Sequence, residues 1–360
     1  MADRIFQPET LAIHAGQIPD VATGARALPI YQTTSFVFDS AEHAASLFNL
    51  QTFGNVYSRL SNPTVAALEE RVAALEGGRA ALASASGMAA EAMALMTILQ
   101  QGDHVVAAGA LYGGSVSMLS VNLAKFGIDT TFVDATRPEA FAAAIRPNTR
   151  ALYAESLGNP SMLVLDIAAV ADVAHAHGLP LVIDNTVPSP YLCNPIAHGA
   201  DIVVHSATKY LAGHGTTLGG VMVESGKFPW DNGKFPGMTE PSPGYHGVKF
   251  YETFGDFGFC MRARMETLRV YGAALSPMSA WQILQGVETL PLRMERHSRN
   301  ALAVARFLQD HPRVGWVNYP GLPDHSQHAL LKRQMRALDG QPMASGLLAF
   351  GVKGGAAAGE

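Results

Sequence analysis

The feature that most constrains the fold is a series of short apolar segments that alternate with alanine-rich segments through the middle of the chain. Their β-branched content is typical of buried strands. Segments such as MAAEAMALMTILQ and DIAAVADVAHAHG lie between them with helical spacing, and Gly178 closes the second as a C-cap. The alternation predicts an α/β fold with a mostly parallel, seven-stranded sheet covered by helices. The predicted strands are RAALAS (79–84), HVVAAG (104–109), DTTFVD (129–134), RALYAES (150–156), PLVIDN (180–185), DIVVHSA (201–207) and GGVMVES (219–225).

The flanking regions have different patterns. Residues 1–60 are irregular and rich in polar and aromatic side chains, which predicts an arm without a core of its own. Residues 61–275 form the predicted large domain, interrupted at 226–258 by a glycine-, proline- and aromatic-rich segment that we expect to be a long loop. Residues 276–360 begin with a helical stretch and predict a smaller α+β domain.

Composition narrows the class of function. With 360 residues, of which 48% are hydrophobic and 15% charged, the chain can bury a sizeable core. The net charge of −5 comes without a block of like charge, so we expect small-molecule substrates and neither nucleic acid nor membrane as a partner. Cys193 and Cys260 form no spaced metal or redox motif. With an opening segment that lacks the apolar core of a signal peptide, this predicts a cytoplasmic protein without a metal site.

Lys209 is the first candidate for chemistry. It follows an apolar strand in VVHSATKYLAGHG and precedes a glycine-rich turn, so we expect its stem to be partly buried. A lone lysine at a strand end is usually a solvated surface residue. Burial, however, disfavours the ammonium form, and a neutral amine is what a Schiff-base lysine requires.

Two further positions change this assessment. Asp184 ends the apolar run PLVID; it is either a turn residue or a carboxylate that meets a cation, such as a protonated pyridine nitrogen. Ser86 and Gly87 stand between a strand and a helix N-terminus, which is either an ordinary cap or a phosphate site. Lysine, aspartate and phosphate cradle on strand ends together predict a pocket for pyridoxal 5'-phosphate (PLP).

The chain contains, in order, the segments YSRLSNPT, ASGMAA, YGGS, ESLGNP, VIDNT, GADIVVHSATKYLAGH and GLLAFGVKGG. In this order they resemble the Cys/Met-metabolism family of PLP-dependent enzymes. The resemblance covers nearly the whole chain, and its lysine motif is highly specific. It implies a fold-type I, aminotransferase-like fold and a homotetramer built from two active dimers.

The resemblance also implies roles for individual residues. Lys209 would bind PLP as a Schiff base and Asp184 would partner the pyridinium nitrogen. Tyr112 would stack on the ring, and Asn159 would contact its phenolic oxygen. The residues expected to hold the phosphate are Ser86, Gly87, Met88, Ser206 and Thr208, together with Tyr57 and Arg59 reaching in from the neighbouring subunit. Those expected to be catalytic are Lys209, Tyr112 and Tyr57. His205 and His214 receive no role and are expected to be structural.

Within the family, the segment 226–258 is the most informative. The γ-lyases and γ-synthases pass more directly from GGVMV into the next helix, whereas the branch that acts on O-acetylhomoserine carries a glycine- and aromatic-rich insertion here. The resemblance therefore implies γ-replacement on an O-acylated homoserine, most simply O-acetyl-L-homoserine, by sulfide or a small thiol. Methionine γ-lyase and the cystathionine γ-synthase and γ-lyase types remain alternatives.

A more distant alternative is a non-enzymatic, nucleotide-binding α/β protein. It is disfavoured because no G-x-G-x-x-G follows the first strand and no P-loop occurs. The resemblance places the residues that grip the substrate carboxylate beyond Glu360. Either the C-terminal domain continues past this point or the substrate site is incomplete, and we name no residue for that role.

Overall fold

The computed structural model describes residues 6–359, which divide into two compact units. Unit 1 contains residues 1–100 and 201–288, and unit 2 contains residues 101–200 and 289–360. The first five residues of the predicted arm and the last residue of the predicted C-terminal domain lie outside the described part. All seven predicted strands form, which confirms the strand assignment along the chain.

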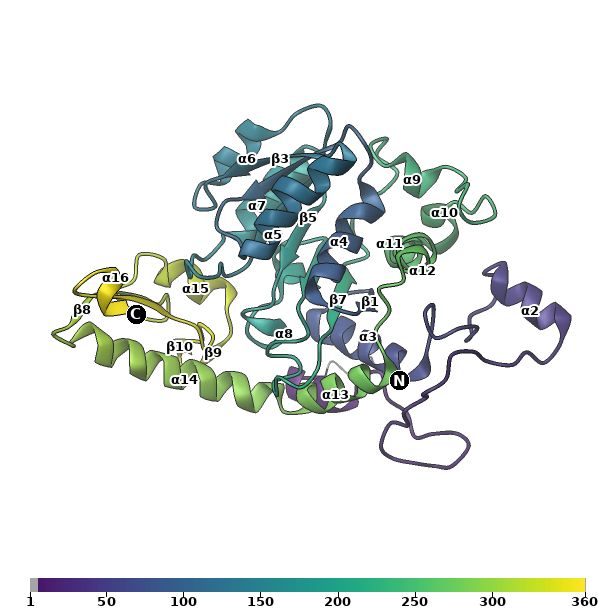
Figure 1. Ribbon diagram of the computed structural model, residues 1–360, viewed down its shortest axis with the longest axis horizontal. Helices are drawn as coiled ribbons and strands as arrows, with labels where there is room; N and C mark the ends of the chain where they lie inside the picture. The colour runs from purple at the N-terminus through teal and green to yellow at the C-terminus, as the bar shows by residue number, and fades with distance from the viewer. Residues whose placement is uncertain (1–5, 360) are drawn as a thin grey trace. The chain divides into compact units, whose positions relative to one another are not determined.

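Unit 1 is built on three strands and the helices around them (Figure 1). Helix α3 packs against β1 and β7, and α4 packs against β6 and β7. The elements of unit 1 are α1 (Pro8–His14), α2 (Ala41–Phe48), α3 (Pro63–Glu76), β1 (Ala80–Ser84), α4 (Gly87–Ile98), β6 (Ile202–His205), β7 (Gly220–Glu224), α9 (Pro236–Thr239), α10 (Phe250–Phe254), α11 (Gly258–Arg262), α12 (Arg269–Tyr271) and α13 (Pro277–Glu288).

Strand β7 runs antiparallel to both β1 and β6. The chain between β6 and β7 contains no crossover helix, and without such a crossover the next strand returns in the opposite direction. Because β1 and β6 are both antiparallel to β7, their carboxyl ends lie at the edge where β7 begins. Ser84 pairs there with Gly220, and His205 pairs with Val221. The segments that follow β1 and β6 therefore meet at one edge of the sheet.

Unit 2 contains four parallel strands in the order β5, β4, β2 and β3. Helix α6 packs on β2 and β3, and α7 packs on β5. Helix α7 ends before Gly178, which has a φ of 63°, as the predicted C-cap requires. The elements of this part are β2 (His104–Ala108), α5 (Gly113–Ser117), β3 (Asp129–Val133), α6 (Pro138–Ala144), β4 (Thr149–Glu155), α7 (Ile167–Ala176), β5 (Leu181–Asp184) and α8 (Ser189–Leu192).

The C-terminal part of unit 2 has the predicted α+β character. Its long helix packs against β8, and β8 pairs antiparallel with β11 (Figure 1). A second small antiparallel pair joins β9 and β10. The elements are α14 (Leu290–Gln309), β8 (Val314–Asn318), α15 (His328–Gln334), β9 (Ala337–Leu338), β10 (Gln341–Pro342), β11 (Ala349–Val352) and α16 (Ala356–Gly359).

The segment 226–258, predicted to be a long loop, consists mostly of turns and irregular structure. It contains the helices α9 and α10, and its aromatic side chains form a buried cluster with Phe259. The Trp230 ring stacks on Phe259 at 5.4 Å between centroids and meets Phe228 edge-on at 4.7 Å. Buried aromatic pairs of this kind hold the segment in place although it has little regular secondary structure.

Candidate functional site

Three segments of unit 1 converge at the edge where β1 and β6 end. Gly87, the first residue of α4, lies against Ser206, the first residue after β6: a Cβ atom on Gly87 would come within 2.6 Å of the Ser206 Cβ atom. A Cβ atom on Gly220 would lie 2.0 Å from the carbonyl oxygen of Ser86. Only glycine permits these two backbone approaches, so the sequence brings the Ser86–Gly87 and Ser206 segments into direct contact.

The N-terminus of α4 supplies backbone donors at this point. The Ser86 side chain caps the helix by accepting the Ala89 N–H at 3.2 Å. The N–H groups of Gly87 and Met88 have no acceptor within the helix, as at any helix start. Two unpaired amides, a helix dipole and the adjacent Ser206 together form a cradle suited to an anion such as a phosphate. This is an arrangement that the residues 86–88 and 206 were expected to form.

Thr208 and Lys209 continue the same segment. The Thr208 hydroxyl donates to the Gly219 carbonyl oxygen at 3.1 Å and accepts the Gly219 N–H at 3.1 Å. This pair of bonds fixes the turn before β7, and it directs the one hydroxyl proton of Thr208 at the backbone. The Lys209 N–H donates to the Ser206 carbonyl oxygen at 3.1 Å, which holds the lysine next to the cradle.

The Lys209 side chain is exposed, which differs from the expected partial burial of its stem. The glycine-rich residues 213–216 that follow are exposed as well. His205, one residue before the cradle, is buried, and its Nε2 lies 2.7 Å from Oε1 of Glu76, at the end of α3. His214 contacts the Ala212 carbonyl oxygen.

Tyr57 and Arg59 lie in the arm, where both are exposed. The Arg59 guanidinium carbon stands 5.2 Å from the centre of the Tyr57 ring, a cation–π contact. Contacts within the same chain hold this segment. Ser35 and Tyr57 form an isolated antiparallel β-bridge, and the Arg264 side chain donates to the Leu60 carbonyl oxygen at 2.6 Å. Among residues 6–359, no hydrogen bond joins Tyr57 or Arg59 to Lys209 of the same chain.

In unit 2, two carboxylates end neighbouring parallel strands. Glu155 at the end of β4 is in register with Asp184 at the end of β5, and both are buried. Cross-strand neighbours point to the same face of a sheet, so the two side chains lie side by side. Asp184 accepts the Thr186 N–H at 2.8 Å. Burial, and then the charge of Asp184, raise the pKa of Glu155 to about 8.

Tyr112 and Asn159 are both tied to Glu155. Oε1 of Glu155 accepts the Tyr112 N–H at 2.5 Å, and Oε2 accepts the Asn159 N–H at 3.1 Å. Tyr112 is the N-cap residue of α5, and 52% of its side chain is exposed, so the ring is available for stacking. Within unit 2, the structure thus brings Tyr112, Asn159 and Asp184 together around one carboxylate.

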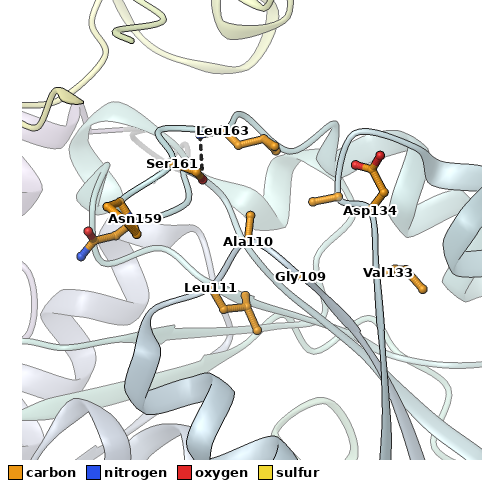
Figure 2. A pocket seen from close by; sticks show the side chains of 10 residues that line it. Gly109, Ala110, Leu111, Val133, Asp134, Asn159, Ser161 and Leu163 are labelled. Carbon is orange, nitrogen blue, oxygen red and sulfur yellow. Dashed lines mark hydrogen bonds between the residues drawn. The ribbon is translucent and has the colours of Figure 1, made fainter. Parts of the chain in front are cut away.

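A hollow of about 410 Å³ lies beyond the carboxyl ends of β2, β3 and β4 (Figure 2). Asn159 stands at one side of it, with its side chain directed away from Asp134 in this view (Figure 2). Leu163 donates its N–H to the Ser161 hydroxyl at 3.4 Å on its rim. The lining residues are Gly109, Ala110, Leu111, Val133, Asp134, Ala135, Asn159, Pro160, Ser161 and Leu163.

Sequence reasoning assigned no role to Glu155, although ESLGNP was one of the motifs that carried the resemblance. The signal was present, because a carboxylate that ends a buried strand is the same observation that singled out Asp184.

Across residues 6–359, no three His, Cys, Asp or Glu side chains are grouped to hold a metal ion. Within the same range, no helix combines the length and the apolar character needed to cross a membrane.

Comparison with known proteins gives matches over nearly the full chain. The sequence model of the family described as Cys/Met metabolism PLP-dependent enzyme matches residues 9–360. An O-acetyl-L-homoserine sulfhydrylase of Leptospira meyeri is 56% identical over 98% of this chain and 80% of its own length. A homocysteine synthase of Schizosaccharomyces pombe is 50% identical over 96% of this chain and 80% of its own length.

A solved structure is similar as well. A crystal structure of an O-acetylhomoserine (thiol)-lyase from Campylobacter jejuni has a TM-score of 0.93 and 40% identity. The match covers 97% of this chain and 85% of the other, and that protein carries a pyridoxyl-lysine phosphate group.

Proposed function

Because the chain belongs to the family of Cys/Met metabolism PLP-dependent enzymes, we propose that it catalyses γ-replacement on O-acetyl-L-homoserine. Sulfide or a small thiol displaces acetate, which gives homocysteine or methionine and places the reaction in methionine biosynthesis. The family membership confirms the predicted resemblance, and the solved relative confirms the predicted fold-type I class. The family match and the solved relative together confirm PLP as the cofactor.

The observation that carries this function is the convergence of Gly87, Ser206 and Lys209 at one edge of unit 1. A cradle that a single Cβ atom would fill is adapted to a group that must approach the backbone closely, and a phosphate fits its donors. The amine that a PLP aldehyde requires follows in the same segment. The residues present therefore fit the cofactor.

We assign the cofactor contacts as follows. The N–H groups of Gly87 and Met88 and the side chains of Ser86, Ser206 and Thr208 hold the phosphate. Thr208 does so on rotation of its hydroxyl away from Gly219. The Asp184 carboxylate keeps a proton on the pyridine nitrogen, the Tyr112 ring stacks on the pyridine ring, and the Asn159 side chain contacts the phenolic oxygen.

PLP supplies an electron sink for negative charge that develops on the amino-acid substrate. Lys209 would hold the cofactor through its amine, and this amine, when free, would take the proton from Cα of the substrate. Loss of a β-proton allows the Cγ–O bond to break, and acetate leaves with the bonding electrons. The thiol sulfur would then form the Cγ–S bond. The protons taken from Cα and Cβ would return to those carbons, and the thiol proton would be released together with the acetate.

The assembly and location of the protein are further parts of the proposal. We place residues 1–60 as an arm on a neighbouring subunit, where Tyr57 and Arg59 complete the phosphate site of that subunit in a homotetramer of two active dimers. Their exposure supports this role. Residues 61–275 act as the cofactor domain and residues 276–360 belong to the C-terminal domain. The reduced state of Cys193 and Cys260 supports a cytoplasmic location.

A steady-state assay tests the reaction. Purified protein is supplied with O-acetyl- or O-succinyl-L-homoserine, each with sulfide, methanethiol or no thiol, and with methionine alone. We expect the highest kcat/KM for O-acetylhomoserine with sulfide or methanethiol, and acetate release that requires the thiol. Release of a 2-oxo acid from methionine as the dominant activity would instead identify a γ-lyase.

A further inference from the structure

Glu155 holds the backbone of two residues that belong to different loops. Its two carboxyl oxygens accept separate N–H groups, one from Tyr112 after β2 and one from Asn159 after β4. Its own strand position is in register with Asp184. One side chain thus connects the three residues of unit 2 that the proposed function assigns to the pyridine ring.

We propose that Glu155 is a positioning residue that fixes Tyr112 and Asn159 relative to Asp184, and thereby sets the orientation of the cofactor ring. The inference rests on the proposed function. The Glu155 oxygens are occupied by backbone donors, so it acts through its neighbours and not as a group that touches the substrate. A displacement of either loop would change ring stacking and the contact with the phenolic oxygen together.

A carboxyl group in this place is difficult to explain by stability alone. It is 7% exposed and stands beside a second buried carboxyl group, and both features favour its neutral form. An apolar or amide side chain would fill the same space with a smaller free-energy cost of burial. What a carboxyl group offers, and an apolar side chain does not, is two acceptor oxygens at a fixed separation for two backbone donors.

The chain offers a matched control. Glu224 is also a buried glutamate, and burial raises its pKa to about 8 as well. It pairs with Ala80 at the far end of β7, away from the Ser84–Gly220 pair that adjoins the cradle. Glu224→Gln therefore makes the same chemical change in a similar environment without touching a residue assigned to the cofactor.

The test measures cofactor binding by apoprotein. Wild type, Glu155→Gln, Glu155→Asp and Glu224→Gln are titrated with PLP, the circular dichroism of the bound cofactor is recorded, and the melting temperature of each apoprotein is measured. Gln keeps one acceptor oxygen and Asp keeps both but falls one methylene short. We expect both Glu155 variants to lose PLP affinity about 10- to 100-fold. This is the size of effect found when a residue that orients a metal ligand is replaced. Their cofactor dichroism should change, whereas Glu224→Gln should match wild type.

A double-mutant cycle separates positioning from a general effect on the fold. Tyr112→Ala removes the ring but keeps the N–H that Glu155 accepts. If Glu155 acts through this ring, the affinity loss caused by Glu155→Gln shrinks in the Tyr112→Ala background; independent effects would multiply. In activity assays, kcat of Glu155→Gln should fall more than KM rises.

The outcomes are distinguishable. Affinity and dichroism equal to wild type in both Glu155 variants would overturn the inference. So would losses that multiply with Tyr112→Ala, or a loss of affinity that is matched by Glu224→Gln. If wild-type apoprotein itself binds no PLP, the proposed function fails, whatever the variants do.

Discussion

Gly87 and Ser206 are in such close contact that the helix start of α4 and the segment after β6 form one structural piece. They are separated by more than a hundred residues in the chain, yet a methyl group on Gly87 would lie 2.6 Å from Cβ and 2.8 Å from Cα of Ser206. One of these atoms belongs to the backbone, so a rotamer change cannot relieve the contact. The cradle therefore depends on a residue without a side chain.

Gly87→Ala should separate these two segments. Overpacking against the backbone costs about 1–3 kcal/mol of unfolding free energy, and the displaced amides of Gly87 and Met88 should lower PLP affinity by roughly tenfold or more. A melting curve and a PLP titration of the apoprotein measure both effects. Gly315→Ala, whose new Cβ atom would meet nothing closer than 3.7 Å, is the control. Wild-type affinity in Gly87→Ala would show that the cradle does not bind the phosphate.

Lys209→Ala should abolish turnover while the protein still binds PLP non-covalently. The cradle residues are unchanged in this variant, and only the amine that joins the aldehyde is lost. Borohydride treatment followed by mass spectrometry should attach the cofactor to wild type and leave Lys209→Ala unlabelled. Full turnover, or a labelled variant, would move the assignment to another lysine.

Asp184→Asn should lower kcat by about one to two orders of magnitude. The substitution keeps the shape and the Thr186 bond but loses the charge that keeps the pyridine nitrogen protonated, a charged hydrogen bond of about 1.5–3 kcal/mol. Removal of the Asp184 charge should also lower the pKa of the neighbouring Glu155, which that charge partly raises. Steady-state kinetics measures the effect on the reaction. A near-normal rate would mean that Asp184 is only a turn residue.

The sequence predicts most of this arrangement because its signals are local. Each buried strand is a short apolar run, and Asp184, Ser86 and Lys209 stand at the ends of such runs or within four residues after them. The direction of β7 is harder to predict from the sequence, because it depends on the absence of a crossover helix after β6. The role of Gly220, which admits the Ser86 carbonyl oxygen, depends on strand pairing and has no local signature.

The segment 226–258 and Glu155 show two different limits of prediction from the sequence. Glycine and proline in the segment predict a loop, whereas the contacts of Trp230 with Phe259 are tertiary and have no local signature in the sequence. Glu155 carries the same signal as Asp184, yet its partner Tyr112 lies 43 residues away. A buried carboxylate can be found from the sequence, whereas the backbone groups that it holds cannot.

Glu224 should make stability depend on pH. Its pKa is about 8 in the folded protein, against an ordinary 4.5, mainly because it is buried. Between these values the folded state holds a proton that the unfolded chain has lost. The free energy of unfolding therefore falls as pH rises through this window, by up to about 1.4 kcal/mol per pH unit, and levels off above it.

Glu224→Gln should flatten this dependence, because an amide can still accept the Cys260 N–H and has no proton to lose. Melting temperatures of the two apoproteins, recorded at about pH 5 and about pH 8, give the comparison: the decrease should be larger for wild type. An equal decrease in both proteins would show that Glu224 titrates in its ordinary range.

Arg59 should act on the phosphate of a neighbouring subunit. It is exposed in its own chain, and its contacts there are confined to the arm. A guanidinium offers forked donors to a dianionic phosphate, a contact of about 1.5–3 kcal/mol. Arg59→Ala should therefore weaken PLP binding by about one to two orders of magnitude. At PLP concentrations below its raised Kd, this variant should be nearly inactive.

Complementation tests whether that contact crosses the subunit interface. Arg59→Ala and Lys209→Ala are mixed under conditions that exchange subunits, with exchange followed by native mass spectrometry. In a mixed dimer, one site combines Lys209 of the first variant with Arg59 of the second, so it contains both wild-type residues. Activity should return in the mixture and in neither variant alone. If exchange occurs and activity stays absent, Arg59 serves its own chain, and the arm does not complete the neighbouring site.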